Sequence, residues 1–217
     1  NTNKIPVFTF FSDSYPHVQS TMGKNMQGKL DSGNPLPQNT AYYKWDDERN
    51  CTELWKQYYV MNWKNARFGN DKGQEEYCNA IEQAMVDFSK PISCNQNNSE
   101  FVLESLTVEA RGKEDVLVVK YLNGRKVPFD MLPQGHKRIF SIVFDVAHRG
   151  YLLQKNCNPY AVVFIDEVEL HLHPSLAQEV VQRFRRSFSN AQLVISTHSP
   201  LVIADYKQDE DNLLYSI

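Results

Sequence analysis

The sequence predicts an α/β fold built around a parallel β-sheet, and two runs of residues carry this prediction. Residues 162–174 begin with four apolar residues and continue into Asp166, Glu167 and a histidine-rich turn. Residues 192–200 repeat the scheme, with an apolar strand that ends in a polar tip around His198. Strands that are apolar on both faces are typical of parallel sheets covered by helices on each side, where ligands gather at the carboxyl ends of the strands. We therefore expect Asp166, Glu167 and His198 to meet at one edge of the sheet.

The segments next to these strands have helical periodicity. Pro174 favours the first turn of a helix, where a missing N–H costs little. The apolar residues that follow recur at three- and four-residue spacing, namely Leu176, Val180, Val181, Phe184 and Phe188. Arg183, Arg185 and Arg186 are expected on a solvated helix face rather than on a track for DNA. Residues 135–155 predict a second amphipathic helix, so the order is helix, strand, helix, strand.

The chain divides into four predicted parts. Residues 1–11 contain a buried core strand, and residues 12–100 form a loop-rich and helical insertion. Within the insertion, residues 12–40 are rich in Ser, Gly, Asn, Pro and Gln, which favours a long surface loop or partial disorder. The later part has two sets of aromatic residues at helical spacing. Residues 101–130 alternate as strands around an Asn-Gly turn and predict an antiparallel hairpin layer. Residues 131–217 form the main core.

Four segments occur in an order that resembles a known family. Phe164 to Glu167 resembles a Walker B motif, and Leu170 to Pro174 is similar to the D-loop that follows it. Ser196 to Pro200 resembles the switch-histidine strand of ABC-type ATPases, and Leu132 to Arg138 is similar to their signature loop. Together these segments resemble the RecF/SMC-like, ABC-type ATP-binding proteins of bacteria that carry the AAA label. This group includes virulence-associated proteins and ATPase subunits of anti-phage systems.

The resemblance implies a P-loop NTPase core of the ABC type that binds ATP and Mg²⁺. It implies that Asp166 holds the magnesium through its water shell and that Glu167 positions or deprotonates the attacking water. His198 would contact the γ-phosphate. The residues of the signature-like loop would bind the ATP of a partner subunit in a head-to-tail homodimer, where a helix N-terminus suits a phosphate, and these residues are Gln134, Gly135, His136 and Lys137.

Two features depart from the family pattern. Pro133 stands where the family usually has serine, so the loop lacks a hydroxyl that would face the γ-phosphate. No Gly-x-x-x-x-Gly-Lys-Ser/Thr sequence is present, because the Gly-Lys pairs at Gly23 and Gly28 lack the required glycine spacing and the following hydroxyl residue. We therefore expect this chain to be the C-terminal part of a longer ATPase, without its first lobe, and to bind ATP poorly by itself.

Composition restricts the remaining functional classes. The net charge of −3 gives no overall field that would attract DNA or an acidic membrane, so a DNA partner is unsupported. No run reaches the length of a transmembrane helix and no signal peptide opens the chain, which favours the cytoplasm. The four cysteines form no Cys-x-x-Cys pair, so we expect free thiols rather than a zinc site. The partners implied are ATP, a second copy of the chain and an effector protein.

Two other functional classes remain open. One is an interaction module that keeps the ATPase scaffold without catalysis, which Pro133 and the absent P-loop favour. The other is a metal-dependent nuclease that uses Asp166, Glu167, Glu169 and His171. A metal site formed by Glu169, His171 and His173 is a related alternative, because alternate residues of an extended segment point the same way. DNA cleavage with a metal and without ATP would identify the nuclease.

Overall fold

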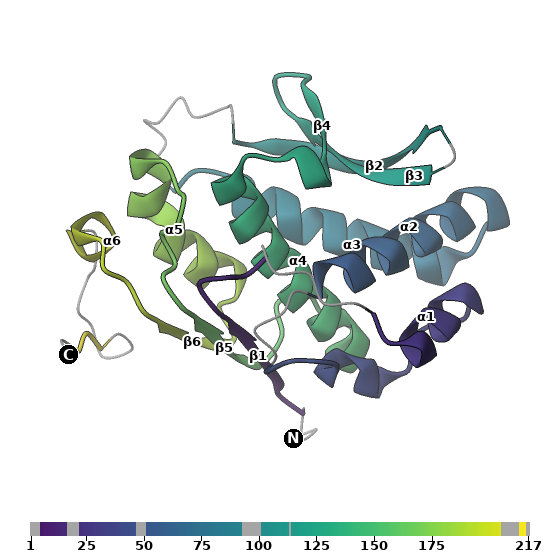
Figure 1. The fold of residues 1–217 in the computed structure, drawn as a ribbon, viewed down its shortest axis with the longest axis horizontal. Coiled ribbons are helices and arrows are strands. Elements are labelled where there is room, and N and C mark those ends of the chain that lie inside the picture. The colour runs from purple at the N-terminus through teal and green to yellow at the C-terminus, as the bar shows by residue number, and fades with distance from the viewer. Residues whose placement is uncertain are drawn as a thin grey trace.

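The computed structural model describes residues 5–16, 22–46, 51–92, 101–112, 114–204 and 213–215. In these residues two three-stranded sheets lie on opposite sides of a layer of helices (Figure 1). The strands are β1 (Val7–Phe11), β2 (Leu103–Arg111), β3 (Glu114–Tyr121), β4 (Lys126–Pro128), β5 (Ala161–Ile165) and β6 (Ala191–Ile195). The α-helices are α1 (Lys24–Asp31), α2 (Thr52–Gly69), α3 (Lys72–Ser89), α4 (Gln134–Gln154), α5 (Pro174–Ser187) and α6 (Pro200–Ala204). Two short 3-10 helices are η1 (Gln38–Tyr42) and η2 (Phe129–Met131).

The first sheet is parallel and has the strand order β1-β5-β6. Its register pairs Phe11 with Ile165 and Ile165 with Ile195, so the three strands end at the same level. The α/β fold with a parallel sheet is therefore confirmed. This alignment places the residues that follow each strand side by side at one edge of the sheet.

Only one face of the parallel sheet is well covered in the described part of the chain. Val163 and Ile165 of β5 are buried, and α4 packs against the sheet at β1. On the opposite face Phe164 is 37% exposed and Val194 is 43% exposed. The expectation of helices on both faces is thus wrong for the described residues, and β6 is a half-exposed edge strand rather than a buried one.

The second sheet is antiparallel, with the order β2-β3-β4. β3 and β4 are joined by a tight turn in which Gly124 has a φ of 82°, a conformation that glycine adopts without strain. The predicted strands and their hairpin are confirmed. This sheet lies against α2 and α3, on the far side of the helices from the parallel sheet (Figure 1).

The insertion contains more regular structure than its composition predicts. The two aromatic helices are confirmed as α2 and α3. The surface loop predicted over 12–40 is wrong in its later part, because the chain forms α1 and η1 there and buries Leu30, Leu36 and Thr40. Residues 17–21 of that stretch lie outside the described residues. None of the described helices is both long and apolar enough to cross a membrane.

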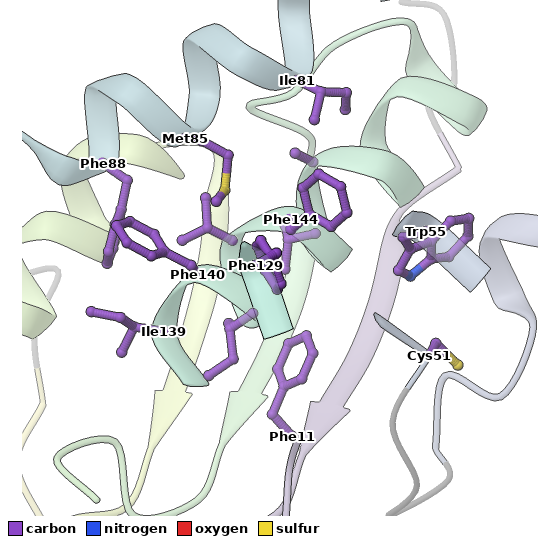
Figure 2. Close-up of a cluster of buried hydrophobic side chains, with 14 of the residues drawn as sticks. Phe11, Cys51, Trp55, Ile81, Met85, Phe88, Phe129, Ile139, Phe140 and Phe144 are labelled. Carbon is purple, nitrogen blue, oxygen red and sulfur yellow. The ribbon is translucent and has the colours of Figure 1, made fainter. Parts of the chain in front are cut away.

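Helix α4 runs through the centre of the molecule and is buried on nearly all sides (Figure 1). Its aromatic residues Phe140 and Phe144 pack beside residues of α2 and α3, including Trp55 and Phe88 (Figure 2). The prediction of one apolar face is therefore incomplete. The helix also buries five polar side chains, which are Arg138, Ser141, Asp145, His148 and Arg149. These side chains need internal partners, because a buried charge is costly without them.

Two arginines of α5 bind the carboxyl end of α3. Arg183 is only 1% exposed, is paired with Glu179 at 2.8 Å, and donates to the carbonyl oxygen of Ser89 at 2.6 Å. Arg186 donates to the carbonyl oxygen of Asp87 at 2.8 Å. The last carbonyl groups of a helix lack partners within the helix, and cations near them are favourable. The expected solvated face is therefore wrong for Arg183, which joins α5 to the insertion.

Candidate functional site

The candidate site lies at the carboxyl edge of the parallel sheet. The chain leaves β5 at Ile165 and continues into Asp166, whose N–H donates to the carbonyl oxygen of Phe11 at 2.9 Å. The N–H of Ser196, just beyond β6, donates to the carbonyl oxygen of Ile165 at 3.0 Å. Ladder hydrogen bonds therefore extend one residue past the strands. They fix the first polar residue on each of two neighbouring strands.

The structure brings Asp166, Glu167 and His198 together at this edge. The Ser196 hydroxyl donates to Oδ1 of Asp166 and accepts from the N–H of Glu167 at 2.9 Å. Nε2 of His198 lies 3.9 Å from Oε1 of Glu167. The His198 side chain is 89% exposed and that of Glu167 is 35% exposed, so both are accessible to a ligand.

The backbone turn at Glu167 explains how the adjacent carboxylates of Asp166 and Glu167 can lie at the same edge of the sheet. Neighbouring side chains point to opposite faces while a strand continues. At Glu167 the φ angle is 44°, in the left-handed region that costs a non-glycine residue energy. Strained backbone of this kind is concentrated at functional sites and persists where its surroundings fix it. Here the surroundings include Ser196 and the buried neighbour Val168, which is 0% exposed.

Arg138 holds the backbone beneath the two carboxylates. Its side chain is fully buried, and its guanidinium donates to the carbonyl oxygens of Asp166 at 2.5 Å and Glu167 at 3.4 Å. It also donates to the carbonyl oxygens of Ser12 at 2.9 Å and Tyr15 in the loop after β1. Burial lowers the pKa of this guanidinium from its usual value. The sequence did not identify Arg138 beyond its membership of the signature-like loop, because its partners are distant in the chain.

The first two residues of α4 lie in different environments. Pro133 is the N-cap and supplies no side-chain hydrogen bond, as its lack of a hydroxyl predicts. Gln134 is exposed, whereas Gly135 is buried against the backbone of the segment after Glu169. A Cβ at position 135 would lie 2.3 Å from the carbonyl oxygen of His171. Glycine at 135 is therefore required by this close approach, and the signature-like loop and the D-loop-like segment form one continuous surface.

The next two residues make internal contacts. The His136 ring packs edge-on against Phe101, with ring centroids 4.8 Å apart. Burial lowers the pKa of His136 to about 4, so the ring is neutral at pH 7. Nζ of Lys137 lies 3.8 Å from Oδ1 of Asp130 in η2. Of the four residues predicted to contact a partner's nucleotide, Gln134 is thus the most accessible.

The histidines after Glu167 have structural contacts. His173 is the N-cap of α5, where its Nδ1 lies 2.9 Å from the Ser175 hydroxyl. Glu169 accepts hydrogen bonds from the Thr197 hydroxyl and from the N–H of His198. In the described ranges no three His, Cys, Asp or Glu side chains form a cluster that could hold a metal ion. The alternative metal site of Glu169, His171 and His173 is therefore wrong, and the nuclease grouping is not gathered either.

Asp166 suits the magnesium that the resemblance implies. Mg²⁺ is usually bound through one or two carboxylates, several waters and substrate phosphates rather than by a full protein cage. Asp166 offers one carboxylate at the edge of the sheet, and the Ser196 hydroxyl orients one of its oxygens. A single ordered and partly exposed carboxylate matches this mode of binding.

Residues 69–204, more than half of the chain, match the family model described as AAA domain, putative AbiEii toxin, Type IV TA system. The chain belongs to this AAA-domain family. The matched region includes the signature-like loop, both acidic residues after β5 and the His198 segment. The predicted relationship to bacterial ATPases of the AAA type is thereby confirmed.

Curated relatives of this AAA-domain protein have names that point to ATPases. The Retron Vc95 probable ATPase of Vibrio cholerae serotype O1 biovar El Tor is 36% identical over 104 residues, which are 46% of this chain and 20% of that protein. The Retron Ec83 probable ATPase of Escherichia coli is 40% identical over 96 residues, 42% of this chain and 17% of that protein. The aligned part of the chain thus spans about a fifth of these relatives.

Solved structures that overlap part of this chain come from SMC ATPases. One comes from work on ATP-driven dimerization and DNA-stimulated activation of SMC ATPases, with a TM-score of 0.42 and 14% identity over 66% of this chain and 78% of that chain. Another is an Smc head bound to the C-winged helix domain of ScpA, with a TM-score of 0.42 and 11% identity over 78% of this chain and 49% of that chain. Overlap of this extent carries no conclusion about activity.

Proposed function

We propose that the full-length protein hydrolyses ATP at the carboxyl edge of the parallel sheet. The observation that carries this proposal is the convergence of Asp166, Glu167 and His198, with His198 Nε2 3.9 Å from Glu167 Oε1. Membership of the AAA-domain family and the names of the retron relatives support the same activity. Phosphoryl transfer needs little covalent chemistry from the protein and depends mainly on positioning and charge stabilisation, to which the residues at this edge would contribute.

Each residue at the edge has a proposed role. Asp166 would hold Mg²⁺, which when bound neutralises phosphate charge. Glu167 would orient the attacking water and accept its proton, and His198 would donate a hydrogen bond to the γ-phosphate. Ser196 and Arg138 would fix the two carboxylates through the side chain of Asp166 and the carbonyl groups below them. Contacts of this kind supply the fixed positions that preorganised electrostatic catalysis requires.

We further propose that two subunits assemble head to tail around the nucleotide. The N-terminus of α4, with Gln134 exposed at its first turn, would face the phosphates of the partner's ATP. The contact between Gly135 and His171 makes this helix start and the D-loop-like segment one surface, which supports a shared interface. We also propose that turnover is coupled to an effector protein, as the resemblance to the ATPase subunits of anti-phage systems implies.

The Glu167→Gln variant tests the proposed chemistry. The amide keeps the size of the side chain but cannot accept the proton of water, so we expect turnover of the full-length protein to fall by about a hundredfold or more. ATP binding should persist, because the proposed phosphate and magnesium contacts come from other residues. Phosphate release and calorimetric ATP binding are measured in parallel on the same preparations.

Glu76→Gln is the matched control for this experiment, because Glu76 is an exposed carboxylate on α3, away from the sheet edge. It should turn over ATP at the unmodified rate. Unchanged turnover in Glu167→Gln would remove the assigned role of Glu167. Absence of turnover in the unmodified full-length protein, at any magnesium concentration, would reject the ATPase proposal itself.

A further inference from the structure

Glu169 makes two hydrogen bonds to the segment that carries His198. Its Oε2 accepts from the Thr197 hydroxyl at 2.7 Å, and its Oε1 accepts from the N–H of His198 at 2.9 Å. Both oxygens of one carboxylate are thus used on adjacent residues of the same loop. Hydrogen bonds to an ionised carboxylate are stronger than those between neutral groups, and two of them fix orientation as well as distance.

The position of His198 depends on this loop. Its side chain is 89% exposed, so packing around the ring contributes little to its placement. The loop itself is short, since β6 ends at Ile195 and α6 begins at Pro200. Thr197 also accepts a hydrogen bond from the N–H of Ser199 at 3.0 Å, which links the Glu169 contact to the start of α6. Glu169 therefore holds both the residue before His198 and the backbone of His198 itself.

The backbone of Glu169 belongs to a different segment. Its carbonyl oxygen accepts from the N–H of Leu172 at 2.9 Å and closes the turn that contains His171. The carbonyl oxygen of His171 is the group that approaches Gly135 at the start of α4. Glu169 thus connects the loop of His198 to the surface formed by Leu170–His173 and the first turn of α4.

We propose that Glu169 is a positioning residue that sets His198 relative to Glu167 and couples it to the segment Leu170–His173. This inference rests on the proposed ATPase function and assigns regulation to the same site. A displacement of Leu170–His173, such as a partner subunit would impose on that surface, moves the Glu169 carboxylate and with it the backbone of His198. Without the carboxylate, the His198 loop keeps its β6 connection but loses its link to this surface.

Kinetic variants of the full-length protein test the coupling. Glu169→Ala removes both acceptors and is expected to lower kcat by about tenfold to a hundredfold, the range caused by small misplacement of a catalytic group, while KM for ATP stays within about twofold. Thr197→Val should show the same pattern to a smaller degree. Thr197→Ser keeps the hydroxyl and should retain most of the turnover. The double variant Glu169→Ala/Thr197→Val should resemble Glu169→Ala, because both substitutions remove one shared interaction.

An exchange measurement tests the inference independently of turnover. The His198 amide donates to Glu169, so hydrogen–deuterium exchange at His198 and Ser199 should accelerate in Glu169→Ala and remain slow in Glu76→Ala. Unchanged protection in Glu169→Ala would overturn the inference, as would full kcat in that variant. If the unmodified protein lacks ATPase activity, the proposed function fails, and the exchange rates still decide whether Glu169 holds the His198 loop.

Discussion

Arg138 fixes the backbone of the candidate site through hydrogen bonds to carbonyl groups. A buried guanidinium needs acceptors for its donors, and in this protein backbone carbonyl groups supply them instead of a carboxylate. The carbonyl groups come from the loop after β1 and from the turn at Glu167. The guanidinium therefore joins two strand ends through backbone carbonyl groups and not through the carboxylate of Asp166 or Glu167. Removing it would leave several carbonyl groups unpaired as well as release the turn.

His148 makes the stability of the protein sensitive to pH. The ring is fully buried beside Trp55 and Phe144, and burial lowers its pKa to about 3. In the unfolded chain a histidine has a pKa of about 6.5, so between these values the unfolded state binds more protons. The free energy of unfolding should be maximal above pH 6.5 and decrease as the pH falls toward 3. This residue contributes at most about 1.4 kcal/mol per pH unit.

Urea unfolding at pH 7, 6 and 5, followed by circular dichroism, measures this dependence. His148→Phe keeps an aromatic ring among the same neighbours but cannot be protonated, so its stability should fall less steeply with acidification. Burial also lowers the pKa of His136, to about 4, so His136 makes stability decrease with acidification as well. The free energy of unfolding of the variant should therefore still depend on pH. Equal slopes in the two proteins would show that His148 is not the proton-linked group.

At the scale of elements, the contact between α4 and the segment after Glu169 requires glycine at position 135. A Cβ there would lie 2.3 Å from the His171 carbonyl oxygen, and this neighbour is a backbone atom rather than the end of a flexible side chain. Gly135→Ala is therefore expected to lower the free energy of unfolding by about 1–3 kcal/mol, the usual cost of overpacking. Chemical denaturation of the variant and the unmodified protein gives this difference directly.

Gly28→Ala is the control, since Gly28 lies within α1 and a Cβ there meets nothing within 4 Å. Alanine is the better helix former, so this variant should gain about 0.5–1 kcal/mol. The free energy of unfolding is thus expected to decrease in Gly135→Ala and to increase in Gly28→Ala. A gain in stability at position 135 would mean that the helix and the His171 backbone do not approach so closely.

Periodicity predicted the elements that bury a continuous apolar stripe, and it failed where partners come from elsewhere in the chain. Helices α2, α3 and α5 were predicted because their apolar residues recur at helical spacing, and Pro174 marked the start of α5. Helix α1 was missed because Met26 and Leu30 are its only buried residues. Arg183 was assigned to the solvent because sequence spacing cannot show that its partners are carbonyl groups of α3.

The whole molecule should unfold as one unit that includes the predicted insertion of residues 12–100. Helices α2 and α3 share one apolar core with α4, and Trp55 Nε1 donates to Oδ2 of Asp145 at 2.7 Å. The described cysteines sample different regions, with Cys51 and Cys78 in the insertion and Cys157 before β5. Burial raises the pKa of each thiol to about 12, so all three should resist alkylation at neutral pH until the protein opens.

Pulsed alkylation with iodoacetamide across a urea gradient, followed by peptide mapping, measures this cooperativity. The three cysteines should become reactive at one common urea midpoint, because a shared core transmits unfolding across it. Labelling of Cys78 well below the midpoint of Cys157 would instead establish the predicted residues 12–100 as an independent unit. Cys94 lies outside the described residues. Peptide mapping distinguishes its labelling from that of the other three cysteines, because Cys94 is in a different peptide.

For the molecule as a whole, the sequence predicted where the site lies better than what holds it. The ends of parallel strands must meet, so the convergence of Asp166, Glu167 and His198 followed from the strand assignments alone. The contributions of Ser196, Glu169 and Arg138 depend on tertiary approaches that no local pattern encodes. The open face with Phe164 and Val194 also escaped prediction, because an apolar strand has the same sequence whether or not a helix covers it.

Arg183 and Arg186 connect the end of helix α5 to the end of helix α3. One end of α5 begins at Pro174, directly after the segment that touches Gly135, and its other end is fastened to the last turn of α3. A helix of 14 residues is about 21 Å long and bends little. A displacement of α3 would therefore be passed along α5 toward the Leu170–His173 turn.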